Sequence, residues 1–325
     1  MKRILIIRFS SIGDIVLTTP VVRCLKTQLP GSEIHYLTKK QNVPILRSNP
    51  YIDKIWEYDK NFKELIPQLK FQGFGFIADL HKNHRSRFVR SQMHVPGASF
   101  PKLDLEKWLL VNLKINLLPK VHVADRYFKA VEPLKVRNDG RGLDYFIPPG
   151  EEFDIHQLPE LFASGFIAVA IGAKHSTKIL PTEKVVEVIR LVDKPVILLG
   201  GKEDRERGER IVKESGANVC NACGITSLNQ SASIIRQSAS VLTNDTGMMH
   251  IAAAFDKRIV SVWGNTVPAF GMVPLMRPGS EQNSFVSEVK GLSCRPCSKL
   301  GYKSCPKKHF RCMNLIDTAE IAKHL

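Results

Sequence analysis

The feature that most constrains the fold of this chain is an alternation of short apolar segments with amphipathic ones, which runs through the first half and then begins again. In the first half, apolar runs of strand length lie at residues 2–9, 33–38, 53–58 and 74–80, and helical patterns lie at 61–70, 103–115 and 123–134. Thr19-Pro20 opens a further helix, which Pro30-Gly31 ends. Alternation of this kind predicts parallel strands joined by helices that cover both faces of a sheet.

Residues 137–161 interrupt the alternation with turn-forming sequences such as Asn138-Asp139-Gly140. Strand patterns then return at 166–171, 195–199, 240–243 and 258–263, and helical patterns return at 182–191, 203–214, 228–237 and 246–255. A chain of 325 residues can bury two cores of ordinary size. We therefore expect two doubly wound α/β domains, residues 1–150 and 160–310, followed by a short tail at 311–325.

The charge of the chain favours a polyanionic partner. It carries 47 lysines and arginines against 31 aspartates and glutamates, a formal net charge of +16. Two long stretches, residues 80–103 and 289–316, contain basic residues and no acidic ones. Nucleic acid, an anionic membrane surface or a phosphorylated glycolipid would suit this excess, although any single lysine is more simply a solvated surface residue. The chain has no zinc-finger, RNP or basic-zipper pattern, which argues against a nucleic-acid partner.

The amino-terminal apolar run resembles a secretory signal only superficially. Arg8 ends the run at residues 4–7, and no small-residue cleavage site follows. No later run reaches the length that crosses a bilayer. We therefore expect a cytoplasmic protein.

Seven cysteines is an odd number, which argues against a fully paired secreted framework. Four of them lie close together near the end of the chain, at Cys294, Cys297, Cys305 and Cys312. Their spacing leaves two alternatives open, a structural zinc site or free thiols.

The first predicted strand leads into the turn Arg8-Phe9-Ser10-Ser11-Ile12-Gly13-Asp14, which lacks the spaced glycines of a dinucleotide-binding fingerprint. Its carboxylate, Asp14, comes at the carboxyl end of the strand and could act as a general base on an acceptor hydroxyl. Ser11 and Asp14 also have the spacing of a capping box, in which they would only begin a helix. The spacing alone favours the cap.

A second candidate segment, residues 242–250, follows a predicted strand and opens a helix. The N-terminus of a helix exposes unpaired N–H groups and can hold a diphosphate. Thr246 can add a hydroxyl donor, and Gly247 allows a phosphate to approach the backbone closely. The alternative is that Asp245 caps the helix and His250 packs within it.

Two other loops of the second half carry charged residues. Lys178 follows the strand at 166–171 and could neutralise the charge that builds on a departing phosphate, although a loop lysine is usually only solvated. After Gly200-Gly201, Glu203 or Asp204 could bind the hydroxyls of a ribose. Equally, both acids could do no more than favour the positive end of the following helix.

Together these segments resemble the lipopolysaccharide heptosyltransferases of glycosyltransferase family 9. The opening from Ile7 to Asp14, continued by Thr18-Thr19-Pro20, is similar to the N-terminal signature of that family. Asp245-Thr246-Gly247-x-x-His250-x-x-Ala253 is similar to its donor-binding signature. Lys178-x-x-Pro181 and Gly200-Gly201 lie between the two signatures in the expected order, so that the resemblance covers nearly the whole chain.

The resemblance implies a GT-B architecture, in which two Rossmann-like domains face each other across a cleft. Residues 1–150 would bind the acceptor, residues 160–310 would bind the nucleotide-sugar donor, and a helix at 311–325 could cross back to the N-terminal domain. An inverting transfer is implied, with no obligatory metal and no cofactor. ADP-heptose is the default donor of the family, and the acceptor is an anionic glycolipid of the lipopolysaccharide core, reached by peripheral contact with the inner face of the membrane.

The resemblance also implies roles for single residues. Asp14 would deprotonate the acceptor hydroxyl, Lys178 would contact the donor phosphates or sugar, and Glu203, with Asp204 as a rival, would bind the ribose. The diphosphate and sugar site would be lined by Asp245, Thr246, Gly247, Met248 and His250.

One departure leaves the donor sugar open, because Ala173-Lys174 stand where family members often have small hydroxyl residues. Two alternative functions also stay open. A nucleotide-sugar epimerase of the same architecture would need no acceptor, and a basic nucleic-acid-binding protein would bind with a steep dependence on salt.

Overall fold

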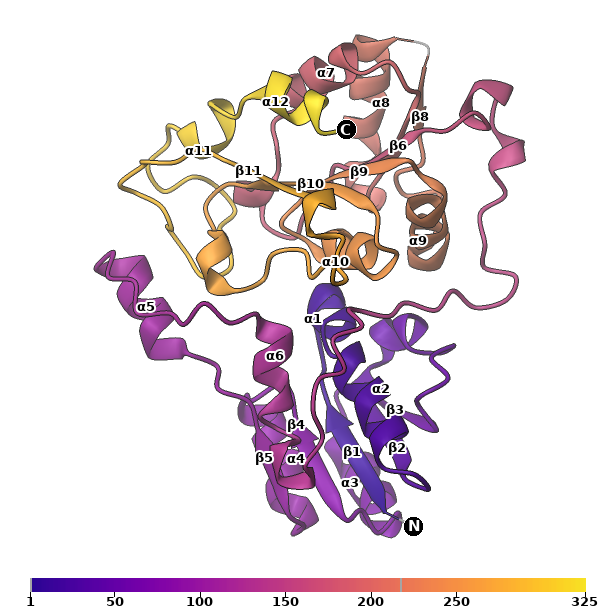
Figure 1. Cartoon of the computed structure of the whole chain (residues 1–325), viewed down its shortest axis with the longest axis vertical. Coiled ribbons are helices and arrows are strands. Elements are labelled where there is room, and N and C mark those ends of the chain that lie inside the picture. The colour runs from indigo at the N-terminus through magenta and orange to yellow at the C-terminus, as the bar shows by residue number, and fades with distance from the viewer. Residues whose placement is uncertain (1, 217) are drawn as a thin grey trace. The chain divides into compact units, whose positions relative to one another are not determined.

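A computed structural model describes residues 2–216 and 218–325, which form two compact units. The first unit comprises Met1–Lys102 and Val121–Pro148, and the second comprises Leu103–Lys120 and Pro149–Leu325. Each unit is built on its own parallel sheet with helices beside it (Figure 1). The prediction of two α/β domains is therefore confirmed.

The first unit has a five-stranded sheet in the order β3-β2-β1-β4-β5, with every neighbouring pair parallel. Its strands are β1 (Arg3–Ile7), β2 (Glu33–Lys39), β3 (Lys54–Tyr58), β4 (Phe76–Asp79) and β5 (Gly97–Ser99). Its α-helices are α1 (Ile12–Val16), α2 (Thr19–Gln28), α3 (Phe62–Phe71), α4 (His84–Met93) and α6 (Val123–Phe128). The central strand β1 is apolar on both faces and fully buried from Ile4 to Ile7, as expected of a parallel strand covered on both sides.

The second unit has a six-stranded parallel sheet in the order β11-β10-β9-β6-β7-β8. Its strands are β6 (Ile167–Ala170), β7 (Val196–Leu199), β8 (Val219–Asn221), β9 (Ser240–Asn244), β10 (Arg258–Trp263) and β11 (Ser284–Glu288). Its α-helices are α5 (Asp104–Asn112), α7 (Thr182–Leu191), α8 (Arg205–Ser215), α9 (Leu228–Gln237), α10 (Gly247–Ala254), α11 (Arg311–Asn314) and α12 (Thr318–Lys323). After β6, the strands β7 and β8 extend the sheet on one side of β6. The chain then returns to place β9 on the other side of β6, and β10 and β11 extend the sheet beyond β9.

This reversal positions the candidate residues. In doubly wound sheets, ligands bind beyond the carboxyl ends of the strands where the strand order reverses. In the second unit that point lies between β6 and β9, and Lys178 and Asp245 follow these two strands. In the first unit the equivalent point lies between β1 and β4, and Asp14 follows β1.

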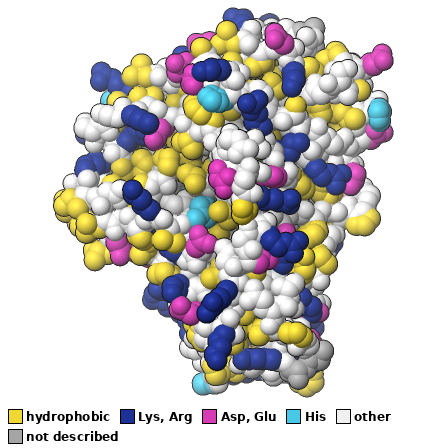
Figure 2. All heavy atoms as spheres, viewed as in Figure 1, with side chains coloured by type: hydrophobic (Ala, Val, Ile, Leu, Met, Phe, Trp, Pro, Cys, Tyr) yellow, Lys and Arg dark blue, Asp and Glu magenta, His cyan; other side chains and the backbone are white. Residues whose placement is uncertain are grey.

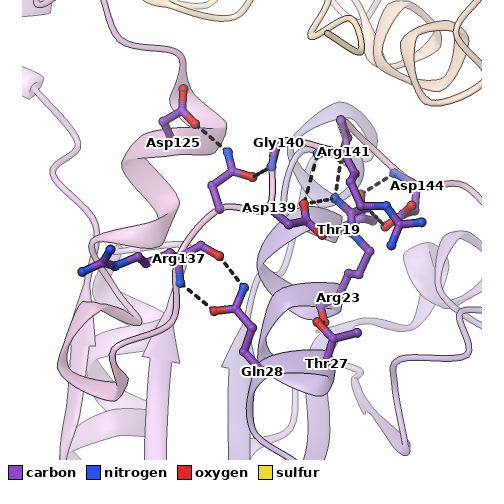
Figure 3. A network of polar contacts seen from close by, with 12 residues as sticks. Thr19, Arg23, Thr27, Gln28, Asp125, Arg137, Asp139, Gly140, Arg141 and Asp144 are labelled. Atoms are coloured by element: carbon purple, nitrogen blue, oxygen red, sulfur yellow. Dashed lines mark hydrogen bonds and ion pairs between the residues drawn. The ribbon is translucent and has the colours of Figure 1, made fainter.

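Arg23 of α2 anchors the last segment of the first unit (Figure 3). Its buried guanidinium donates to both oxygens of Asp139, at 2.9 and 2.8 Å, and to the carbonyl of Gly142 at 2.9 Å. It also forms an ion pair with Asp144. The hydrogen bonds from Arg23 lower the pKa of Asp139 to about 2, so this carboxylate is ionised across the neutral range.

The units of the structure divide the chain differently from the predicted domains at residues 103–120. Residues 103–120 lie in the second unit, where the Lys114 ammonium donates to the carbonyls of Cys294 and Pro296 at 3.3 and 2.7 Å. Residues 311–325 are grouped with the second unit. Helix α12 packs on α7 within the second unit, where Ile321 is fully buried in the apolar core. Neither contact follows a local pattern, since each joins segments more than a hundred residues apart.

Within residues 2–216 and 218–325, no helix has both the length and the apolar character that spanning a bilayer requires.

Candidate active site

Asp14 lies in the first turn of α1, directly after the carboxyl end of β1. Its Oδ2 accepts hydrogen bonds from the Ser11 hydroxyl at 2.6 Å and from the Ser11 N–H at 3.2 Å. These are contacts of the capping-box alternative, and that reading of the spacing is confirmed. Its Oδ1 lies 2.8 Å from the Arg8 guanidinium in an ion pair. The carboxylate is held at both oxygens, yet 21% of the side chain stays exposed.

Arg8 is the residue beside Asp14 that the sequence reasoning missed. Its guanidinium is buried and donates to the carbonyls of Ser10 and Leu80 at 2.8 and 2.5 Å. Burial lowers the pKa of Arg8, but the Asp14 charge opposes it and the net pKa lies above the ordinary value. The charged guanidinium therefore fixes the position of the Asp14 carboxylate. The sequence signal that could have identified this partner is an arginine at the end of a buried strand, because an isolated charge there is costly and needs a carboxylate.

A neutral histidine borders the same charged pair. His81 packs edge-on against the ring of Phe9, with the ring centroids 5.4 Å apart. Burial, reinforced by the charge of Arg8, lowers the pKa of His81 to about 3. The imidazole is therefore neutral at physiological pH and adds no charge around Asp14.

In the second unit, Lys178 and Asp245 form an ion pair with 16% and 10% of their side chains exposed. Lys178 ends the short 3-10 helix η5 (Ser176–Lys178), and Asp245 follows β9. The ammonium also lies 3.2 Å from the Asp245 carbonyl. The Thr266 hydroxyl, after β10, donates to the Asp245 carboxylate at 2.7 Å. Loops after three neighbouring strands thus meet at one charged group.

Asn244 holds these loops together and was also missed from the sequence. Its side-chain oxygen accepts from the Leu180 N–H at 3.1 Å, and its amide nitrogen donates to the Ile171 carbonyl at 3.0 Å. A single buried side chain at the end of β9 therefore closes the loop that carries Lys178. An asparagine at this position gives no distinctive signal, because the partners are backbone atoms some seventy residues away.

Helix α10 begins at Gly247 with Thr246 as its N-cap residue. The alternative in which Asp245 caps this helix is wrong, because the Asp245 side chain is engaged by Lys178 and Thr266 instead. The Thr246 side chain makes no capping hydrogen bond to the helix. The first N–H groups of α10 therefore remain available to a ligand, as expected of an anion-binding helix end. Met248 lies in this first turn, and His250 is buried in the next.

The two acids predicted to compete for a ribose have different surroundings. Asp204 is buried, and its carboxylate accepts from the Gly201 N–H at 2.9 Å within the 3-10 helix η6 (Lys202–Asp204). A Cβ on Gly172 would come within 2.1 Å of the Asp204 carboxylate, so this acid fills the space between two loops. Glu203 is exposed. Of the two, Glu203 is the acid that a ligand can reach.

Asn265, after β10, has a side chain that is 2% exposed. Within the described part of the chain, neither its amide nitrogen nor its amide oxygen has a hydrogen-bond partner. A buried amide without partners is costly and is expected to gain them from water or from a ligand. Its sequence neighbour Thr266 donates to Asp245 of the charged pair described above.

The seven cysteines are all free thiols in the structure. The Cys294 sulfur lies 3.9 Å from the His309 Nε2 atom, and the Cys297 thiol donates to the Cys294 carbonyl at 2.9 Å. Across the described ranges, no three His, Cys, Asp or Glu side chains are arranged to hold a metal ion. Burial raises the pKa of Cys297 and of Cys312 to about 11, which keeps both thiols protonated at neutral pH.

The structure brings together most of the residues predicted for the donor. Lys178, Asp245, Thr246 and Gly247 lie at the carboxyl ends of β6 and β9, and Glu203 follows the adjacent strand β7. Asp14 belongs to the first unit. The second unit thus offers a lysine, a helix N-terminus and an acid at one edge of a sheet, an arrangement that can hold the phosphates and sugar of a nucleotide.

Residues 151–303 match the family described as glycosyltransferase family 9 (heptosyltransferase). The chain is 25% identical to lipooligosaccharide heptosyltransferase 2 of Haemophilus ducreyi, over 82% of this chain and 85% of that protein. It is 23% identical to lipopolysaccharide heptosyltransferase 1 of Campylobacter coli, over 99% and 97% of the two chains.

Solved structures agree on the fold. A family 9 glycosyltransferase from Veillonella parvula aligns over 88% of this chain and 85% of its own, with a TM-score of 0.71 and 24% identity. Escherichia coli ADP-heptose lps heptosyltransferase II aligns over 99% and 100%, with a TM-score of 0.67 and 20% identity. The chain is therefore a glycosyltransferase similar to the heptosyltransferases of family 9, and its fold is the GT-B fold of two Rossmann-like domains.

Proposed function

We propose that this enzyme transfers a heptose from ADP-heptose to a hydroxyl of the lipopolysaccharide core, with inversion at the anomeric carbon. The heptosyltransferase names of its relatives support the sugar and the acceptor class. The observation that carries the proposal is the Lys178–Asp245 pair, which lies beside the start of α10 where the strand order of the second sheet reverses.

The donor binds to the second unit. The first N–H groups of α10, after Thr246 and from Gly247 and Met248 onward, hold the diphosphate, and the Lys178 ammonium supplies the opposite charge. Lys178 is already positioned by Asp245, so little side-chain ordering is needed when the donor binds. Glu203 accepts hydrogen bonds from the ribose hydroxyls. Asp245 and His250 line the sugar side of the site.

Asp14 of the first unit is the general base. It removes the proton of the acceptor hydroxyl as that oxygen forms a bond to the anomeric carbon, and the bond from that carbon to the diphosphate oxygen breaks. Lys178 and the end of α10 stabilise the negative charge that moves onto the leaving diphosphate. Arg8 and Ser11 keep the Asp14 carboxylate in one orientation.

A donor panel tests the substrate. The protein is screened by thermal shift against ADP, ADP-heptose, UDP-glucose and GDP-mannose, since a bound ligand raises the melting temperature. ADP and ADP-heptose are expected to give the largest shifts. Transfer is then measured with ADP-heptose and a heptose-deficient core glycolipid. Conversion of the donor without any acceptor would replace this proposal with the epimerase alternative.

A matched pair of variants tests the base. Asp14→Asn is expected to abolish transfer and to leave the thermal shift with ADP-heptose nearly unchanged. Asp125→Asn is the control, because Asp125 is an exposed acid of the first unit whose carboxylate accepts from Asn138 at 2.8 Å. This control should turn over like the unaltered protein. Near-normal transfer by Asp14→Asn would remove Asp14 from the mechanism.

The acceptor class makes the enzyme a peripheral protein of the inner face of the membrane. Lipid-linked core saccharide is anionic, and the net charge of +16 favours its approach.

A further inference from the structure

Large apolar side chains are exposed together along one segment of the second unit. Leu105 and Trp108 lie one turn apart on α5, and Leu113, Ile115 and Leu117 follow the helix. These five side chains are between 47% and 68% exposed, and Leu300 is 66% exposed. We call these six residues the α5 face. A contiguous apolar surface on a folded protein marks a contact with another molecule or with a membrane.

The backbone beneath the α5 face is held in place by contacts with the rest of the second unit. Lys114 donates to the carbonyls of Cys294 and Pro296, which fixes the segment after α5 to the loop near the end of the chain. Lys299 pairs with Asp104 at 3.1 Å, which places Leu300 next to the start of α5. The apolar side chains therefore stay exposed while the backbone around them is held in place.

Basic residues border this surface. The adjoining segment carries exposed cations at Lys303, Lys307, Lys308 and, at the start of α11, Arg311, and no acid occurs between Glu288 and Asp317, whereas α5 itself begins with Asp104 and Glu106. Figure 2 shows hydrophobic side chains with Lys and Arg among them on the side where Figure 1 places α5 and α11. Apolar residues rimmed by cations suit the interface of an anionic bilayer, in which the apolar groups enter the acyl boundary and the cations meet the headgroups.

We propose that the α5 face is the surface by which the protein docks onto anionic lipid bilayers, with Trp108 and Leu117 entering the interface. The inference rests on the proposed function for the choice of a membrane as partner. The charge argues against a second copy of the chain as the occupant, because two identical basic surfaces would repel each other.

Tryptophan fluorescence can report on this contact directly. The chain has three tryptophans, of which Trp108 is 51% exposed, whereas Trp56 and Trp263 are 7% and 1% exposed. Vesicles of phosphatidylcholine mixed with phosphatidylglycerol should shift the emission of the full chain to shorter wavelength. Lipids brominated on their acyl chains should quench that emission. Vesicles of phosphatidylcholine alone should do neither.

Two sets of variants separate the apolar and the electrostatic contributions. Trp108→Ser combined with Leu117→Ser should weaken pelleting with the anionic vesicles at least tenfold, as should Lys307→Glu combined with Lys308→Glu. Leu191→Ser is the matched control, since Leu191 is an equally exposed apolar residue of the second unit, at the end of α7. This control should pellet like the unaltered protein.

Three results would overturn the proposal: pelleting unchanged in the Trp108/Leu117 variant, emission that brominated lipid does not quench, or concentration-dependent dimers in sedimentation that this variant abolishes. A deacylated, soluble acceptor distinguishes a failure of the docking proposal from a failure of the proposed function, because transfer to it needs no membrane. The Trp108/Leu117 variant should retain that activity and lose transfer only to acceptor embedded in vesicles. If the unaltered protein transfers to neither acceptor but still docks, the proposed function fails and the docking surface stands.

Discussion

Replacing Lys178 by Met is expected to destabilise the second unit and to remove most of its affinity for ADP. Lys178 and Asp245 are largely buried, and Met matches the length of the lysine stem without its charge. The substitution leaves the Asp245 carboxylate with the hydrogen bond from the Thr266 hydroxyl, at 2.7 Å, but without its cation. An ionised carboxylate that loses a buried cation loses the interaction that offset its desolvation.

The magnitude follows from the burial of the pair. Removing one partner of a fully buried pair costs about 3–5 kcal/mol. Here 16% and 10% of the two side chains are exposed and Thr266 remains, so we expect about 2–3 kcal/mol. For a unit of this size the loss corresponds to a fall of roughly 4–12 °C in melting temperature. Lys184→Met is the control, because Lys184 pairs with Glu187 on the surface of α7 and should cost less than about 1 kcal/mol.

The assay is guanidinium unfolding in a Trp56→Phe background. This background leaves Trp108 and Trp263 as reporters, both in the second unit. A double-mutant cycle with Asp245→Asn isolates the pair, and we expect a coupling free energy of about 2 kcal/mol. A saturating concentration of ADP should stabilise the unaltered protein by about 2.7 kcal/mol at a hundred times Kd and the variant by far less. Additive single effects, or an unchanged response to ADP, would refute the reasoning.

Other substitutions test the remaining contacts. Asp14→Asn should lower the rate of transfer at least about 100-fold, the lower end of what a general base contributes, when turnover is measured at saturating donor. Arg23→Met should destabilise the first unit by about 2–4 kcal/mol, measured through Trp56 emission, because Asp139 and Asp144 lose their cation. The folded-state pKa of Asp139 is lowered to about 2, so its contribution is fully present above its unfolded-state pKa and is lost as pH falls through 2. Burial raises the pKa of Asp144, so protonation of this acid favours the folded state and offsets part of that loss, and Asp139→Asn should remove the loss of stability that this cluster contributes on acidification. Asn265→Leu should raise the stability of the unliganded second unit by about 1 kcal/mol by removing an unpaired buried amide, whereas a loss of similar size would mean that water pairs with it.

Much of the fold could be predicted from the sequence because strands and helices leave local patterns. The apolar run of β1 and the turn-rich break at 137–161 both depend on neighbours along the chain. The capping-box spacing of Ser11 and Asp14 is local in the same way, and the hydrogen bond from the Ser11 N–H to the Asp14 carboxylate that it predicts is present. The positions of Lys178 and Asp245 after their strands followed from the strand assignments alone, since parallel strands end at a common edge.

Tertiary structure decided which side chains meet. The Lys178–Asp245 pair joins residues 67 positions apart, and Asn244 closes its loop through backbone atoms just as distant. Residues 103–120 lie in the second unit, where Lys114 donates hydrogen bonds to carbonyls some 180 residues away in the sequence. Periodicity and turn chemistry describe only the near neighbours of a residue. Long-range pairs are selected by the packing of the whole core, and only the folded chain contains that information.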